Sequence, residues 1–76
     1  MIKIYSSERC RYCRELKGYL DKLSIPYQVL DVGKNEKYAK ELFDISGQTG
    51  IPVSVIGDEV IVGFDRSRID NALTRL

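Results

Sequence analysis

The first 32 residues of the chain carry a strand pattern, a helix pattern and a second strand pattern in succession. Residues 2–5 are rich in β-forming side chains and residues 27–32 are rich in them again, which predicts two strands. Between them, apolar side chains at spacings of three and four predict a helix from about Arg11 to Leu23, ending before Pro26. Because this helix is the connection, the two strands are expected to be parallel and joined by a right-handed crossover.

The middle of the chain adds a helix and a hairpin. A second helix pattern begins at Asn35 or Glu36 and ends at Ser46, with Asn35 as its candidate N-cap. Two β-rich runs, 53–56 and 60–62, flank a short turn that contains glycine. Such a pair of runs predicts a β-hairpin.

A last apolar stripe predicts a helix near the end of the chain, capped at its start by Asp65 or Ser67. The stripe consists of Ile69, Ala72, Leu73 and Leu76. The complete order is strand, helix, strand, helix, strand, strand, helix (βαβαββα). This order belongs to the α/β class and predicts a mixed sheet with helices on both faces.

Length and charge limit the class of protein to which the chain can belong. At 76 residues the chain is expected to form a single domain, 1–76. With 12 basic and 11 acidic residues it has no basic excess that would favour nucleic acid. No apolar run approaches the roughly 20 residues of a membrane span, and residues 1–5 do not lead into the apolar core of a signal peptide. We therefore expect a cytoplasmic protein that binds neither nucleic acid nor membranes.

The chain contains two cysteines and no histidine. Without histidine it cannot build a Ser-His-Asp or Cys-His nucleophilic site. A zinc site within one chain would lack two of its four soft or imidazole ligands, so we predict no metal-binding residues. The absence of a Gly-Lys-Ser or Gly-Lys-Thr triplet excludes a Walker phosphate loop. The two cysteines are therefore the main candidates for chemistry.

Cys10 and Cys13 lie between the first strand and the first helix, and a Cys-x-x-Cys pair in a βαβ context is a thioredoxin-like redox signal. Cys10 falls at the helix start, where free N–H groups and the flanking Arg9 and Arg11 are expected to lower the pKa of its thiol. Cys13 follows one turn later on the apolar stripe, so it should be more buried and within disulfide reach. This predicts that Cys10 attacks a substrate disulfide and that Cys13 then resolves the mixed disulfide.

Three other interpretations of the pair remain open. A structural disulfide would close a very short loop and restrain little of the unfolded chain. Two inert buried cysteines fit poorly with the polar Arg11 and the Tyr12 between them. Two chains could also share a metal through four sulfur atoms. Redox exchange is the interpretation that we favour.

Three segments of the chain resemble the glutaredoxin family: Cys10-Arg11-Tyr12-Cys13, Thr49-Gly50-Ile51-Pro52-Val53 and Val62-Gly63-Phe64-Asp65. The resemblance covers nearly the whole length. It implies a thioredoxin fold with a four-stranded sheet and three helices. It also implies a cis Ile51-Pro52 bond that faces the cysteines and leaves the Ile51 backbone free to pair with a peptide or glutathione.

The resemblance further implies a groove for substrate or glutathione beside the cysteines. Its predicted residues are Arg11, Tyr12, Thr49, Ile51, Pro52, Gly63, Phe64 and Asp65. Tyr12 would form a wall of this groove, and Asp65 is either a ligand contact or a helix cap. Thr49 would hydrogen-bond to backbone or to ligand, and Phe64 either packs under the sheet or faces a partner.

The chain departs from common glutaredoxins at three places. Arg11 replaces the motif proline, Ser7 replaces a lysine, and Gly63-Phe64 replaces a Gly-Gly pair. The Gly-Phe pair is similar to that of NrdH-type redoxins, which thioredoxin reductase reduces, although those usually carry an arginine where this chain has Asp65. We therefore expect the electrons to come from glutathione or from a flavoprotein reductase.

The favoured function is a thiol–disulfide oxidoreductase that reduces protein or glutathione mixed disulfides, as a monomer and without a tightly bound cofactor. One alternative is an NrdH-type electron donor reduced by thioredoxin reductase. Another is a dimer that holds a [2Fe–2S] cluster with sulfur from glutathione, which the absence of proline at Arg11 permits. A catalytically silent interaction domain is the third.

Overall fold

The predicted order of elements is the order found in the computed structural model, which describes residues 2–76. The elements are β1 (Ile2–Ser6), α1 (Arg11–Lys22), β2 (Tyr27–Asp31), α2 (Glu36–Ser46), β3 (Val53–Ile56), β4 (Glu59–Val62) and α3 (Arg66–Thr74). Every predicted strand and helix is therefore present, and the bounds differ from the prediction only near their ends.

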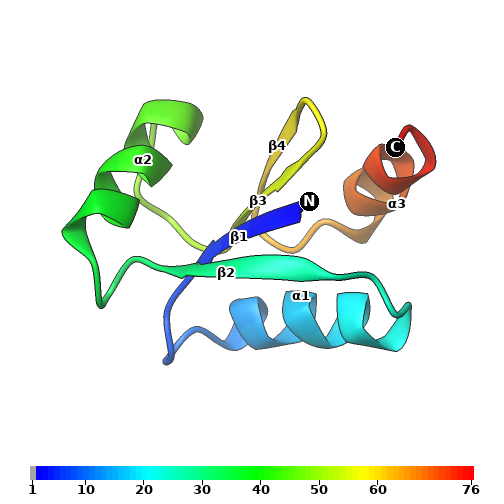
Figure 1. The fold of residues 1–76 in the computed structure, drawn as a ribbon, viewed down its shortest axis with the longest axis horizontal. Helices are drawn as coiled ribbons and strands as arrows, with labels where there is room; N and C mark the ends of the chain where they lie inside the picture. Colours follow the sequence, from blue (N-terminus) through cyan, green and yellow to red (C-terminus); the bar gives the residue numbers. More distant parts are fainter. Residues whose placement is uncertain (1) are drawn as a thin grey trace.

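The strands of residues 2–76 form one mixed sheet in the order β2-β1-β3-β4. β1 runs parallel to β2, with Ile4 opposite Val29, and antiparallel to β3, with Ile4 opposite Ser54. β3 and β4 pair across a two-residue turn in which Gly57 has a φ of 59°, a value that favours glycine. Figure 1 shows β1 and β2 lying side by side, with α1 as the connection between them. The βαβ start, the hairpin and the mixed sheet are thus confirmed.

Side chains that alternate along β1 point to opposite faces of the sheet. Ile4 points to the face covered by α1 and α3, and Tyr5 points to the face covered by α2. The first face holds a buried cluster of Ile2, Ile4, Leu16, Leu20, Ile56, Ile61, Ile69 and Ala72. The second holds a smaller cluster of Tyr5, Leu30, Leu42 and Val53. Helices therefore cover both faces, as predicted.

The helices begin and end according to local rules. Asn35 caps α2 by accepting a hydrogen bond from the N–H of Lys37 at 2.9 Å. Of the two candidate caps of α3, Asp65 and Ser67, the structure shows Asp65, whose side chain accepts a hydrogen bond from the N–H of Arg68 at 3.2 Å. Gly47 ends α2 in the left-handed conformation, with a φ of 71°.

The placement of Leu76 on the last apolar stripe is wrong. α3 ends at Thr74, and the N–H of Arg75 turns to the carbonyls of Ala72 and Leu73. This tight last turn breaks the helical spacing that would return Leu76 to the core, and Leu76 is 72% exposed. Leu23 and Ile45, the last members of the other two stripes, also lie at helix ends and are exposed.

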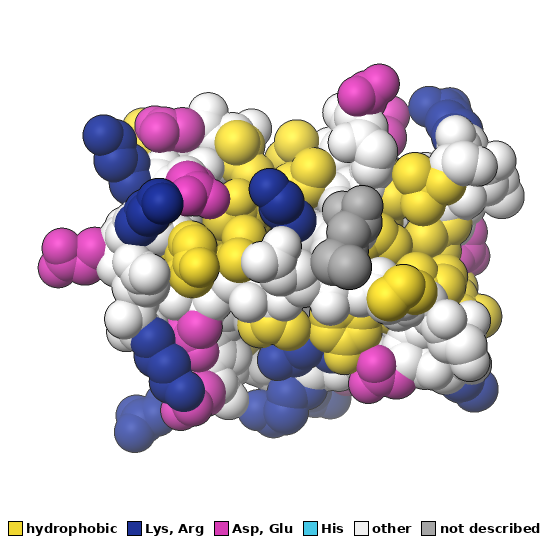
Figure 2. All heavy atoms as spheres, viewed as in Figure 1, with side chains coloured by type: hydrophobic (Ala, Val, Ile, Leu, Met, Phe, Trp, Pro, Cys, Tyr) yellow, Lys and Arg dark blue, Asp and Glu magenta, His cyan; other side chains and the backbone are white. Residues whose placement is uncertain are grey.

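Charged side chains of both signs are interspersed with apolar ones on the face shown in Figure 2. This mixture agrees with the nearly balanced count of 12 basic and 11 acidic residues. Among the helices of residues 2–76, none combines the length and the apolar character that crossing a bilayer would require.

Candidate active site

Cys10 is the N-cap of α1. Its backbone is extended, with φ −93° and ψ 114°, and its Sγ accepts a hydrogen bond from the N–H of Cys13 at 3.2 Å. Its carbonyl accepts from the N–H of Arg14 at 3.2 Å and so begins the helix. A sulfur atom in this position meets the unpaired N–H groups and the positive end of the helix dipole. In a reduced pair, the same contacts favour a thiolate on Cys10.

Cys10 and Cys13 are joined by a disulfide, with their Cα atoms 5.2 Å apart. The two cysteines differ in access: Cys13 is fully buried, whereas Cys10 is partly exposed. The difference follows from their positions, because Cys13 shares the inner stripe of α1 with Leu16 and Leu20. A reagent from solution can therefore reach the first sulfur more easily than the second.

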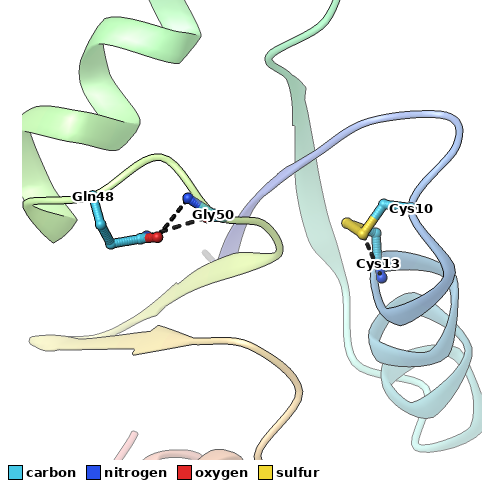
Figure 3. Close-up of a disulfide and its surroundings, with 4 residues drawn as sticks. All are labelled: Cys10, Cys13, Gln48 and Gly50. Atoms are coloured by element: carbon cyan, nitrogen blue, oxygen red, sulfur yellow. Dashed lines mark hydrogen bonds between the residues drawn. A yellow bond between two sulfur atoms is a disulfide. The ribbon is translucent and has the colours of Figure 1, made fainter.

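The loop between α2 and β3 carries three of the predicted groove residues, Thr49, Ile51 and Pro52. The Ile51-Pro52 bond is cis, as the family resemblance implied, and Pro52 is buried. The N–H of Gly63 donates to the carbonyl of Pro52 at 2.8 Å, which brings the end of β4 beside this loop. In the view of Figure 3, the disulfide lies on the side of α1 that is turned toward Gly50.

Gln48 organises this loop through its side-chain amide (Figure 3). Its Oε1 accepts from the N–H of Gly50, and its Nε2 donates to the carbonyl of Gly50 at 3.1 Å and to Oγ of Ser46 at 3.1 Å. Thr49, Ile51 and Pro52 of this loop were predicted as groove residues, whereas these contacts of Gln48 were not predicted. The one signal in the sequence was the position of Gln48 in a short loop, between Gly47 and Gly50 and just before Pro52.

A model of the glutaredoxin family matches residues 2–61. The chain belongs to the glutaredoxin family. A glutaredoxin-like 8.6 kDa protein in a rubredoxin operon of Clostridium pasteurianum, itself uncharacterized, is 36% identical over 75 residues, covering 99% of this chain and 100% of the relative. Glutaredoxin 3 of Escherichia coli (strain K12) is 31% identical over 64 residues, covering 84% of this chain and 77% of the relative.

Among solved structures, the glutaredoxin-like NrdH-redoxin from Escherichia coli superposes with a TM-score of 0.81 at 24% identity, covering 92% of this chain and 91% of the other. At that identity the likeness concerns the fold. The thioredoxin fold expected from the sequence is therefore confirmed, and the protein is a glutaredoxin-like redox protein with a Cys-x-x-Cys pair at disulfide distance.

Four of the groove residues predicted for this glutaredoxin are exposed: Arg11, Tyr12, Thr49 and Asp65. Arg11 Nε lies 3.7 Å from Oε1 of Glu15, one turn along the helix. Tyr12, between the two cysteines, is 56% exposed and is available to a partner molecule. The structure thus places Arg11 and Tyr12 beside the disulfide, and their role in binding stays a prediction.

Phe64 and Asp65 follow Gly63 and have structural contacts of their own. The Phe64 ring packs against the α1–α3 cluster and meets the ring of Tyr19 edge-on, with centroids 6.0 Å apart. The guanidinium of Arg66 lies over the same Tyr19 ring at 4.7 Å. Of the two alternatives for Phe64, the structure thus shows packing, and the Asp65 carboxylate caps α3.

A lysine lies near Ser7, the position at which common glutaredoxins carry a lysine of their own. Lys34 lines the same surface hollow as Ser7, although it comes from the loop after β2. Its Nζ forms an ion pair with Oε1 of Glu8, and this hydrogen bond raises the pKa of Lys34. The cation is therefore present near the cysteine loop, but it already has an acidic partner.

The part of the chain that the structure describes contains no group of three or more histidine, cysteine, aspartate or glutamate residues that could hold a metal ion. The cysteine pair supplies two sulfur atoms, and a four-ligand site would need further donors from outside the chain. The arrangement of one accessible and one buried sulfur is instead suited to thiol–disulfide exchange.

Proposed function

We propose that the protein is a thiol–disulfide oxidoreductase that reduces disulfides of proteins or glutathione mixed disulfides through Cys10 and Cys13. The observation that carries this proposal is the asymmetry of the pair. Cys10 caps α1, receives the Cys13 N–H and is partly exposed, whereas Cys13 is fully buried behind it. Such an arrangement gives one sulfur to the substrate and keeps the other for the second step.

The reaction needs no atoms beyond the two dithiol–disulfide pairs. The Cys10 thiolate attacks one sulfur of the substrate disulfide, which forms a mixed disulfide and releases the other substrate sulfur as a thiolate that takes up a proton. Cys13 then loses its proton, attacks Sγ of Cys10 and expels the second substrate thiol. Two electrons have passed to the substrate, and the protein is left with the Cys10–Cys13 disulfide that the structure contains.

The backbone of Ile51 is the proposed contact for the substrate chain. Within residues 2–76 its N–H and carbonyl take part in no hydrogen bond, although both neighbours, Gly50 and Pro52, have theirs satisfied. A free donor and acceptor on one residue are what a peptide backbone needs for pairing. Tyr12, Thr49, Pro52, Gly63 and Asp65 are proposed to surround the bound chain.

Glutathione and a flavoprotein reductase both remain candidates for the reductant, with no tightly bound cofactor in the protein. The Lys34–Glu8 ion pair in the hollow beside Ser7 would have to open before Lys34 could bind a glutathione carboxylate. This favours the reductase as donor, in the manner of NrdH-type redoxins. Turnover with NADPH and thioredoxin reductase, but not with glutathione, glutathione reductase and NADPH, would support a flavoprotein reductase as the donor. The opposite result would identify glutathione as the donor.

The first test is the pair of variants Cys10→Ser and Cys13→Ser. Cys10→Ser is expected to lower the rate of disulfide reduction to that without protein, because the attacking sulfur is lost. Cys13→Ser is expected to accumulate a mixed disulfide with the substrate, visible as added mass on the intact protein. Since the chain has only two cysteines, each variant leaves one thiol to follow. Substantial turnover by Cys10→Ser would refute the proposed function.

A further inference from the structure

The Gln48 side chain occupies the two backbone groups of Gly50. The amide Oε1 accepts the Gly50 N–H, and the amide Nε2 donates to the Gly50 carbonyl at 3.1 Å. A neighbouring β-strand would use the same N–H and carbonyl of one residue when it pairs with this segment. The Gln48 amide thus takes the place of a strand partner at the residue immediately before Ile51.

Gln48 is itself held at the end of α2. Its other Nε2 proton goes to Oγ of Ser46 at 3.1 Å, and Ser46 Oγ donates back to the carbonyl of Leu42 at 2.6 Å. A carboxamide has two N–H protons, and here both are used, so the orientation of the amide is fixed. A continuous chain of hydrogen bonds therefore runs from α2 through Ser46 and Gln48 to Gly50.

Gly50 is required for this contact because the amide approaches its backbone closely. A Cβ atom at position 50 would lie 2.6 Å from Gln48 Oε1, closer than real Cβ atoms approach other heavy atoms, so the flexible Gln48 side chain would have to move away. The φ of Gly50 is not among the positive values found at Gly47, Gly57 and Gly63. The backbone conformation would therefore accept another residue, but its Cβ atom would displace the Gln48 amide from this contact.

We propose that Gln48 is a positioning residue that sets the register in which a disulfide-bearing peptide binds. Because the Gln48 amide holds both backbone groups of Gly50, the residue before Ile51 is fixed, and the free N–H and carbonyl of Ile51 are presented to an extended peptide in one orientation. The same bonds hold the Ile51 backbone still before the peptide arrives, which reduces the ordering that binding requires. The inference rests on the proposed function, since it concerns the substrate chain that Cys10 attacks.

The test uses the full chain, a synthetic peptide with one disulfide as substrate and dithiothreitol as the reductant. Gln48→Ala is expected to raise KM about tenfold with kcat nearly unchanged, because it removes ordering hydrogen bonds and leaves the sulfur atoms in place. Exchange of the Gly50 amide hydrogen should become faster, and the alkylation rate of reduced Cys10 should not change. The matched control is Gln28→Ala, since Gln28 is exposed on β2 and should leave KM unchanged.

A double-mutant cycle with Gly50→Ala separates positioning from general loosening. Gly50→Ala alone should raise KM as Gln48→Ala does, because the new Cβ displaces the amide. In the double variant the Cβ meets a shortened side chain, so KM should be no higher than in either single variant. Effects that multiply, or a Gln48→Ala protein with unchanged KM, would overturn the inference.

The outcomes for Gln48 and for the proposed function can be told apart. A wild-type chain that fails to reduce the peptide contradicts the oxidoreductase function, and it does so whatever the Gln48 variants do. Normal turnover by wild type, with an unchanged KM in Gln48→Ala, rejects only the positioning role. A Gln48→Ala protein in which Cys10 alkylation also changes has lost its helix start as well, which counts against a role confined to the loop.

Discussion

The two halves of the proposed site, the cysteine pair and the loop after α2, are attached to opposite faces of the sheet and use different parts of the chain. The cysteine half begins α1, on the face with eight buried cluster residues, and its chemistry lies in two side chains. The loop half follows α2, on the face with four, and offers the backbone of Ile51. The difference teaches that the two sulfur atoms are held by a well-packed layer, whereas the loop that carries Ile51, the proposed substrate contact, is held by the local hydrogen bonds of Gln48.

The largest expected effect comes from removing the main core side chain under each half. Leu16→Ala and Leu42→Ala each delete a fully buried leucine, one on α1 and one on α2. Each should lower the free energy of unfolding by about 2–5 kcal/mol. We expect the greater loss for Leu16, because its cluster is larger and leaves less freedom for neighbours to fill the space. Chemical denaturation at equilibrium measures both.

The same pair of variants tests whether the two halves are independent. At a temperature where both variants remain folded, Leu42→Ala should affect peptide KM more than Cys10 alkylation, and Leu16→Ala should do the reverse. Equal effects of both variants on both measurements would mean that the layers do not support the halves separately. An exposed leucine, Leu23, provides the control, since Leu23→Ala should change neither measurement.

A second prediction concerns a buried hydroxyl on the α1–α3 face that has no hydrogen-bond partner among the described residues. Ser54 is fully buried opposite Ile4, and its hydroxyl has no hydrogen-bond partner within the described residues. An unsatisfied buried hydroxyl destabilises by about 1–3 kcal/mol. Ser54→Ala should therefore raise the free energy of unfolding by about 1 kcal/mol, after allowance for the small volume that is lost.

Ser67→Ala is the matched control for this substitution, because Ser67 is exposed on α3. Surface substitutions of this kind change stability by about 0.5 kcal/mol or less. A Ser54→Ala protein that is less stable than wild type would show that the hydroxyl has a partner, such as a buried water, and that this face is better satisfied than the contacts indicate.

The elements were predictable from the sequence because their signals are local. The stripe of α1, the Asn35 and Asp65 caps and the glycine turn of the hairpin each act within a few residues, and the Cys-x-x-Cys spacing places two sulfurs on one helical turn. The role of Gln48 was not predictable in this way. It depends on the path of an irregular loop, and a side-chain amide that binds backbone leaves no periodic pattern.

Tertiary structure accounts for two residues whose burial differs from what the residue type or the apolar spacing suggests, Ser54 and Leu76. The burial of Ser54 follows from its place in the interior strand β3, between β1 and β4, whereas the residue type alone suggests an exposed position. Leu76 shows the opposite case, since an apolar residue lies outside the core because α3 ends two residues earlier. Both outcomes depend on where the chain is in space, which hydrophobic spacing does not specify.

The smallest expected effect concerns pH and the α2 face. Tyr5 is buried, and its hydroxyl donates to Oε1 of Glu41 at 3.1 Å, which ties β1 to α2. Burial, together with the hydrogen bond to Glu41, raises the pKa of Tyr5 above its ordinary value of 10.0. The folded state therefore favours the neutral phenol. Its contribution to stability is fully present below pH 10 and is lost as the pH rises through the folded-state pKa.

Tyr5→Phe removes this contribution, since phenylalanine cannot ionise. The free energy of unfolding should fall less steeply between pH 9 and about pH 11 in the variant than in wild type. Some slope should remain, because the pKa values of Tyr19 and Tyr27 are also raised, the first mainly by its hydrogen bond to Asp70 and the second mainly by burial. Denaturation curves at several alkaline pH values measure the two slopes. Identical slopes would mean that folding does not change the pKa of Tyr5, and that the α2 face is no more sensitive to alkaline pH than the α1–α3 face.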